Sequence, residues 1–170
     1  MRSIRICVWI VLIVLAGESM PAGGASGVGP VVIGAVEEVV LLPWGVRMRS
    51  RVDTGAAVSS LDARTIRVRT VRRQKAVRFV LVGDDDQRVA LDLPVSGYRR
   101  ISTVDGGIEK RPIVEMEICI AGQRLRAEFT LNDRSRMEYR MLVGRNILAG
   151  RFLVDVAEQD LVPPACPASH

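Results

Sequence analysis

The triplet Asp53-Thr54-Gly55 contains the residues of this sequence best suited to catalysis. A carboxylate can activate water for attack on a peptide carbonyl when a second carboxyl group shares one proton with it, because two close like charges cannot both ionise. The Thr54 hydroxyl could hold the loop by hydrogen bonding to its partner, and Gly55 would let the backbone approach the carboxylates closely. The alternative is an ordinary turn at a strand end, since so short a triplet also arises by chance.

A single Asp-Thr-Gly in 170 residues does not supply the second carboxyl group. The sequence Asp105-Gly106-Gly107 does not replace it, because it lacks the hydroxyl residue and falls at an expected hairpin tip. We therefore expect a homodimer with twofold symmetry, in which the Asp53 side chains of both copies meet at the axis. A polypeptide is the expected substrate.

The triplet, a hairpin and a short apolar run follow one another in a recognisable order. About ninety residues after the triplet, Met141-Leu142-Val143 precedes Gly144-Arg145, and the Gly-rich hairpin tip lies between the two. These segments resemble the retropepsin-like aspartic peptidase family labelled ATP-dependent zinc protease, which includes RimK-associated and exported members. The resemblance extends from about residue 33 to 156, through segments 52–56, 59–63, 109–114, 131–135, 141–145 and 152–155.

The resemblance implies an all-β, closed retropepsin-like barrel with a β-hairpin flap, one short helix and aspartic endopeptidase activity. Residues 99–111 would form the flap over an extended substrate, which would add backbone hydrogen bonds as an extra strand. The substrate-binding tip of the flap would contain Thr103, Asp105, Gly106 and Gly107.

Four further residues are expected to support the catalytic loop: Ala56, Gly144, Arg145 and Asp133. In viral retropepsins an acid four residues after the catalytic one pairs with the Gly-Arg arginine, but here that position is Ala57. Arg145 must then use another acid, such as Asp62 or Asp133, or stay partly exposed. For Asp133 we expect a turn cap, with a substrate-facing role as the alternative.

The family label is not supported by metal or nucleotide motifs. His170 is the single histidine, and His-Glu-x-x-His is absent. A Gly-x-x-x-x-Gly-Lys-Ser/Thr phosphate loop is absent as well. The sequence therefore predicts an enzyme with no metal and no cofactor.

Period-two patterns and turn residues predict many short strands. Val46, Met48 and Ser50 alternate with arginines in a strand that runs into the triplet. Hairpins are expected from residues 76–82 with 88–95, 99–103 with 108–114, and 115–120 with 124–131. Residues 145–149 could form one helical turn that Gly150 ends.

The N-terminus has the pattern of an export signal. Arg2 and Arg5 precede an apolar run over residues 6–16, so we expect a signal peptide at 1–25, with an uncleaved inner-membrane anchor as the alternative. A linker at 26–32, a peptidase domain at 33–157 and a Pro-rich tail at 158–170 would follow. The protein is expected to be exported, to the periplasm or an equivalent space.

The formal net charge of +5 is concentrated in residues 64–78. A solvated hairpin face explains these cations, and the alternative is an anionic lipid surface or an acidic polypeptide as partner. Nucleic acid is not expected, because no aromatic residues are interleaved for base stacking. The rival functions are a non-catalytic binding module on the same fold and a membrane-apposed structural partner.

Two cysteines remain after the signal. Cys119 lies in a buried strand pattern and Cys166 in the tail. An oxidising compartment would permit a disulfide, but a buried free thiol and a separate tail thiol are expected.

Overall fold

A computed structural model describes residues 29–102 and 106–166, which form β-strands, their connections and one short helix. The elements in chain order are β1 (Val31–Gly34), β2 (Val36–Leu42), β3 (Val46–Val52), β4 (Ser59–Val71), β5 (Gln74–Val82), β6 (Arg88–Pro94), β7 (Gly97–Ser102), β8 (Ile108–Ile120), β9 (Gln123–Asn132), β10 (Met141–Val143), α1 (Arg145–Leu148) and β11 (Phe152–Asp155). The predicted hairpins and the predicted helical turn are all present.

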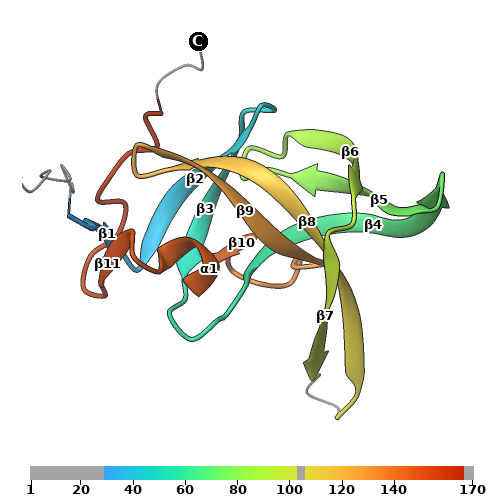
Figure 1. Cartoon of the computed structure of the whole chain (residues 1–170). Helices are drawn as coiled ribbons and strands as arrows, with labels where there is room; N and C mark the ends of the chain where they lie inside the picture. Colours follow the sequence, from blue (N-terminus) through green and yellow to red (C-terminus); the bar gives the residue numbers. More distant parts are fainter. Residues whose placement is uncertain (1–28, 103–105, 167–170) are drawn as a thin grey trace, which may run out of the picture.

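Six strands close into a barrel, as predicted (Figure 1). The path runs β10-β3-β2-β8-β9-β4, and β4 pairs with β10 to complete the ring. The short strand β10 makes the closure possible because it pairs on both edges: Met141 lies opposite Ser50 of β3 and Leu61 of β4.

The barrel interior is built from aliphatic residues that alternate along the strands. In β3, Val46 and Met48 are fully buried while Arg47 and Arg49 face outward. This alternation follows from the period of two of a strand with one face in the core. Phe79 and Phe129 are the largest of the fully buried side chains and complete the packing.

Two hairpins extend from the barrel (Figure 1). Strand β4 pairs with β9 near its start and with β5 further along, and the register shifts between Arg64 and Arg67. This shift is an irregularity within one continuous strand. Strand β8 pairs with β7 at its start and with β9 at its end, so it serves both hairpins predicted around it.

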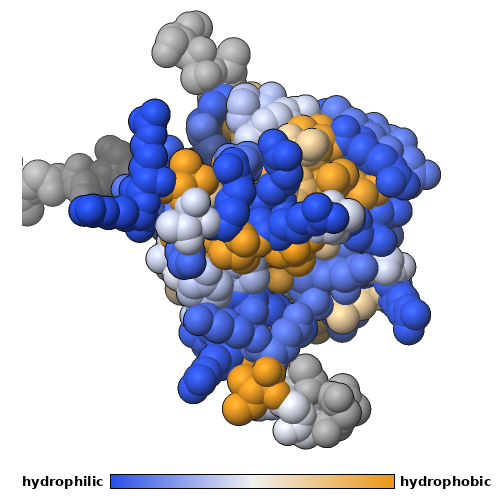
Figure 2. Space-filling model, turned by 90° about the vertical axis from the view of Figure 1, so that its right-hand side faces the viewer, coloured by the Kyte–Doolittle hydropathy of each residue, from blue (hydrophilic) through white to orange (hydrophobic). Residues whose placement is uncertain are grey.

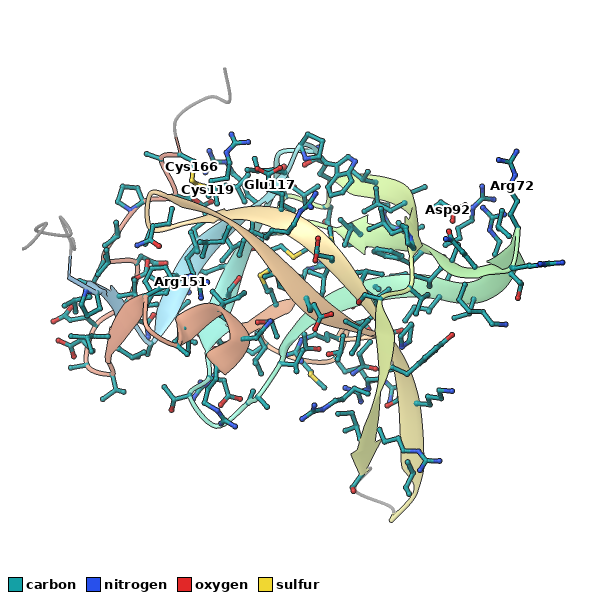
Figure 3. All side chains as sticks on the ribbon, viewed as in Figure 1. Arg72, Asp92, Glu117, Cys119, Arg151 and Cys166 are labelled. Carbon is teal, nitrogen blue, oxygen red and sulfur yellow. A yellow bond between two sulfur atoms is a disulfide. The ribbon has the colours of Figure 1, made fainter. Side chains whose placement is uncertain are left out.

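The expectation of two separate thiols is wrong, because Cys119 and Cys166 form a disulfide with their Cα atoms 5.9 Å apart. Cys119 lies on β8 and is buried. The tail folds back along the barrel and brings Cys166 to it (Figure 3). The pairing could not be predicted from the sequence pattern, because the two cysteines are separated by 47 positions.

The segment after β11 is held to the barrel by main-chain contacts. The buried Glu37 carboxylate accepts hydrogen bonds from the N–H groups of Gly34 and Leu161, at 2.7 and 3.1 Å. Gly34 is required by this approach, since a Cβ there would lie 2.6 Å from the carbonyl oxygen of Glu158. Arg49 adds an ion pair to Asp160 at 2.7 Å. Within residues 29–102 and 106–166, no helix is long and apolar enough to cross a membrane.

Candidate active site

Asp53 is the first residue after β3 and lies beside β10. Its backbone N–H donates to the carbonyl of Val143 at 2.9 Å. Its carboxylate oxygen Oδ1 accepts the backbone N–H groups of Gly55 at 2.9 Å and Ala56 at 3.1 Å. Oδ2 has no hydrogen-bond donor in the described part of the chain. One oxygen of the half-buried carboxylate is thus fixed and the other is free.

The backbone of Gly55 lies close to the Asp53 carboxylate, as predicted. A Cβ built on Gly55 would lie 3.1 Å from Oδ1 of Asp53, tighter than ordinary van der Waals contact. A larger residue would push the carboxylate from the N–H groups that orient it.

Arg145 supports the loop through carbonyl oxygens rather than through an acid. Its guanidinium donates to the main-chain oxygens of Thr54 at 2.9 Å and Gly55 at 2.7 Å, and its backbone N–H donates to Ala56 at 2.9 Å. The expectation of Asp62 or Asp133 as its partner is wrong. The alternative of partial exposure is confirmed, because Arg145 is exposed.

Gly144 packs directly against the same loop. A Cβ at this position would lie 2.9 Å from the backbone carbon of Val58 and 3.0 Å from the carbonyl oxygen of Ala56. Both are main-chain atoms, which cannot move aside as a flexible side chain can. Gly144 therefore lets β10 and α1 approach the turn that presents Asp53.

A hydrogen-bond network beneath the loop was missed in the sequence. The side-chain oxygen of Asn146 accepts the backbone N–H and the hydroxyl of Ser59, at 2.9 and 2.8 Å. The Ser59 hydroxyl in turn accepts the N–H of Gly144 at 2.9 Å. Ser59 is the first residue of segment 59–63 and Asn146 directly follows segment 141–145, and both segments carry the family resemblance. This proximity was the sequence signal that could have identified the two residues.

Asp62 is a fully buried carboxylate, and its role was also missed. Its two oxygens accept Nε of Arg64 at 3.0 and 3.2 Å, and one of them also accepts Nη2 of Arg64 at 2.8 Å. The backbone N–H of Arg134 donates to it at 2.7 Å. Arg140 lies 3.7 Å away. The surrounding donors compensate the burial of this charge.

Arg134 is a buried cation near the candidate catalytic residue. Its Nε donates to the carbonyl of Tyr139 at 3.1 Å, whereas its two terminal nitrogens have no protein partner among the described residues. Burial lowers the pKa of Arg134 below its ordinary value, and Arg111 acts in the same direction. The charges of Asp62 and Asp53 oppose this effect. Arg134 therefore lies within electrostatic range of both Asp53 and Arg111.

Asp133 caps a turn, as the sequence analysis favoured. Its carboxylate accepts the backbone N–H of Ser135 at 2.9 Å and faces Arg64 at 3.6 Å. The hydrogen bonds from Ser135 hold the pKa of Asp133 below its ordinary value, with the charge of Arg64 adding to the effect.

The predicted flap hairpin is present. Strands β7 and β8 pair from Gly97 opposite Ile113 to Ser102 opposite Ile108. Gly106 has a φ of +80°, which favours glycine at the tip. Gly107 follows it and is exposed. The hairpin lies on the same side of the barrel as the β3–β4 loop (Figure 1). Thr103 and Asp105 lie outside the described residues.

A hollow of about 350 Å³ lies beside the candidate catalytic loop and is lined partly by Asp53, Thr54 and Val156. Apolar side chains are exposed near it on the two-stranded β1–β11 sheet, where Val32 is 48% and Leu153 is 56% exposed. Val156 is 81% exposed. The Thr54 hydroxyl has no hydrogen bond within the described chain. No group of three or more His, Cys, Asp or Glu residues among the described positions could hold a metal ion.

Comparison with protein-family models gives a match over residues 32–164, to the family described as RimB-like, retropepsin-like aspartic endopeptidase RimB. The match spans the candidate catalytic loop, the β7–β8 hairpin, β10, α1 and the start of the disulfide-bonded tail.

The relatives found by sequence comparison are named as ligases rather than as peptidases. A probable alpha-L-glutamate ligase of Shewanella halifaxensis is 34% identical over 131 residues, which is 75% of this chain and 29% of that protein. One of Parasynechococcus marenigrum is 31% identical over 129 residues, which is 74% of this chain and 28% of that protein. The chain thus spans under a third of the length of these relatives.

Among solved structures, the chain is similar to a Legionella pneumophila protein of unknown function, Lpg0085. The TM-score is 0.66 at 24% identity, and the alignment covers 77% of this chain and 97% of that one. At this identity the likeness shows a shared fold.

Proposed function

Because this chain belongs to the RimB-like family of retropepsin-like aspartic endopeptidases, we propose that it hydrolyses peptide bonds as a homodimer with paired Asp53 carboxyl groups. The observation that carries the proposal is the asymmetry of the Asp53 carboxylate. Its Oδ1 is held by the N–H groups of Gly55 and Ala56, and its Oδ2 is left for a proton or a water molecule. Retropepsin chemistry requires such a group from each of two copies.

In the proposed reaction the two Asp53 carboxyl groups share one proton and hold a water between them. The ionised carboxylate takes a proton from the water while the water oxygen attacks the carbonyl carbon of the substrate. The protonated group gives its proton to the carbonyl oxygen, which forms a tetrahedral diol. Transfer of a proton to the amide nitrogen then allows the C–N bond to break. One water is consumed, and neither a metal nor a nucleotide takes part.

The β1–β11 sheet supports the dimer. Val32 and Leu153 are neighbours in its register and are both about half exposed, next to the hollow that Asp53 and Thr54 line. Burial of these side chains against a second copy would stabilise the pair and bring the two catalytic loops together. The free Thr54 hydroxyl would then hydrogen-bond to the partner copy.

An acidic polypeptide is the proposed substrate. The terminal nitrogens of Arg134 have no partner among the described residues although the residue is only 8% exposed. Arg111 at the base of the flap is a second cation nearby, and it is paired with Glu109 at 2.6 Å. Guanidinium groups in such surroundings bind carboxylates strongly. The names of the relatives, which refer to α-L-glutamate ligation, point to the same chemistry. An extended substrate would lie under the β7–β8 flap.

We also propose an exported location. The Cys119–Cys166 disulfide is consistent with an oxidising compartment. The expected signal at residues 1–25 lies outside the described residues. Sequencing the N-terminus of the mature protein tests this proposal, and a chain that still begins at Met1 would favour the anchored alternative.

Cleavage of a peptide library that includes Glu- and Asp-rich members tests the proposed activity. The wild-type chain should cleave acid-rich peptides in the presence of a strong chelator and without ATP, whereas Asp53→Asn should be inactive while retaining its melting temperature. Activity that survives in Asp53→Asn would refute the assignment, and activity lost to the chelator and restored by zinc would refute the metal-free mechanism.

A further inference from the structure

The cations of this protein are concentrated on the hairpin formed by β4 and β5. Residues 64–78 contain seven cations and no acidic residue: Arg64, Arg67, Arg69, Arg72, Arg73, Lys75 and Arg78. These seven exceed the formal net charge of +5, so the remainder of the chain is slightly acidic. A basic excess confined to one projection differs from the mixed charges of an ordinary solvated surface.

The hairpin projects away from the barrel (Figure 1). From Arg67 onward, β4 is exposed at every position, and Gln74 and Lys75 on β5 are exposed as well. The strands remain paired to the end, where Val71 lies opposite Gln74. The two residues between them, Arg72 and Arg73, form the turn.

The backbone of this turn is unfavourable for arginine. Arg72 and Arg73 have φ values of +45° and +67°, as in the two-residue turns that favour Asn-Gly. A residue with a Cβ destabilises this conformation relative to glycine. Two arginines are thus present where the local fold would be more stable without them, which indicates that their charge has another use.

Three of the seven cations, all nearer the barrel than the turn, are paired within the chain, and Arg64 pairs with Asp62 at 2.8 Å. Asp92 on β6 contacts Arg69 and lies 3.8 Å from Arg78. Arg67, Arg72 and Arg73 make no ion pair with any residue that the structure describes. Figure 3 shows Arg72 at the far end of the hairpin, pointing away from the barrel.

Apolar side chains are exposed among the cations. Val68 is 42% and Val71 is 37% exposed. On the face of the molecule toward which the hairpin points, long hydrophilic side chains stand in front of hydrophobic atoms (Figure 2). Val68 and Val71 lie on opposite faces of the ribbon, because successive side chains in a strand alternate. An end-on approach is therefore the orientation that brings both valines and the turn to one surface.

We propose that the tip of the β4–β5 hairpin docks end-on onto an anionic lipid surface. The guanidinium groups of Arg72 and Arg73 at the tip would contact the lipid phosphates, and Val71 beside the turn and Val68 behind it would pack within the headgroup region. Cations with interspersed apolar side chains fit this interface. An acidic polypeptide would engage the cations and leave the valines without a role.

Flotation of the full chain with vesicles tests this proposal. Vesicles of phosphatidylcholine with phosphatidylglycerol should bind the chain more tightly than vesicles of phosphatidylcholine alone, which measure any binding through the N-terminal apolar run. Arg72→Asn with Arg73→Gly should lower the anionic-vesicle partition coefficient about 25-fold, since each cation at an anionic surface contributes a factor of roughly five. The Asn-Gly turn should leave the melting temperature unchanged or raise it.

Two comparisons make the test selective. Arg88→Gln with Arg126→Gln removes the same charge from exposed sites outside the hairpin tip and should change binding by much less. Val68→Thr with Val71→Thr keeps every cation and should lower vesicle binding several-fold without changing binding to polyglutamate. Equal effects of the two arginine pairs would overturn the proposal. Unchanged vesicle binding by the valine variant, together with tight binding to polyglutamate at the hairpin, would identify an acidic polypeptide as the partner instead.

Discussion

Asn146 accepts two hydrogen bonds from Ser59, one from its backbone N–H at 2.9 Å and one from its hydroxyl at 2.8 Å. This contact joins α1, which begins at the arginine of the Gly-Arg pair, to the first residue of β4, just after the candidate catalytic loop. It links two sequence signatures that are separated by 87 positions.

We predict that Asn146→Ala destabilises the protein by about 1–3 kcal/mol, because the N–H of Ser59 would lose its acceptor near the core. Activity should fall as well, since the same network holds Gly144 against the loop. Urea unfolding and peptide cleavage measure the two effects. The control is Gln87→Ala at an exposed position, where both quantities should stay unchanged. An Asn146→Ala protein of wild-type stability would show that the network does not support the loop.

Arg134 provides a test of the proposed acidic substrate. Arg134→Lys keeps a cation but loses the planar pair of donors, and Arg134→Gln loses the charge. Both should raise KM for acid-rich peptides by about 10-fold or more and alter KM for neutral peptides much less, as expected for a lost charge-assisted hydrogen bond. An equal rise in KM for acidic and neutral peptides would indicate that Arg134 has a structural role.

The disulfide should stabilise the folded tail. Cys119→Ser with Cys166→Ser should lower the free energy of unfolding by about 2–4 kcal/mol, as is typical for a bridge that closes a long loop. Reducing the wild-type protein should reproduce most of this loss, and the double variant should not respond to reductant. Equal stability of the oxidised and reduced wild-type protein would argue against the Cys119–Cys166 pairing.

Asp133 should contribute to the loss of folding stability at acidic pH. The hydrogen bonds from Ser135 hold its pKa below the ordinary value of 3.8, so its ionised form favours the folded state. This contribution is present above pH 3.8 and is lost as the pH falls through the lowered pKa. Asp133→Asn keeps an acceptor but cannot titrate, so its stability should depend less steeply on pH below about 4. Because Asp133 is exposed, the difference should be small, and a steeper dependence would contradict this account.

Much of the fold was predictable because its local signals are strong. Asp105-Gly106-Gly107 marked the tip of one hairpin, and the alternation around Met48 marked a strand that runs into Asp53. The long-range contacts were not predictable. The main-chain acceptors of Arg145, the return of Cys166 to Cys119 and the burial of Asp62 depend on which distant segments meet, and residue type alone does not encode this.

The central claim is that Asp53 acts only in a pair across a dimer axis, and subunit mixing tests it most directly. Wild-type chain and Asp53→Asn should be mixed at constant total concentration under conditions where subunits exchange freely, and peptide cleavage measured as a function of the wild-type fraction. A heterodimer has one ionisable carboxyl group where two are needed, so it should be inactive. The account predicts that activity falls with the square of the wild-type fraction. A linear fall, or full activity in a demonstrated monomer, would contradict it, because the second catalytic group would then lie within the same chain.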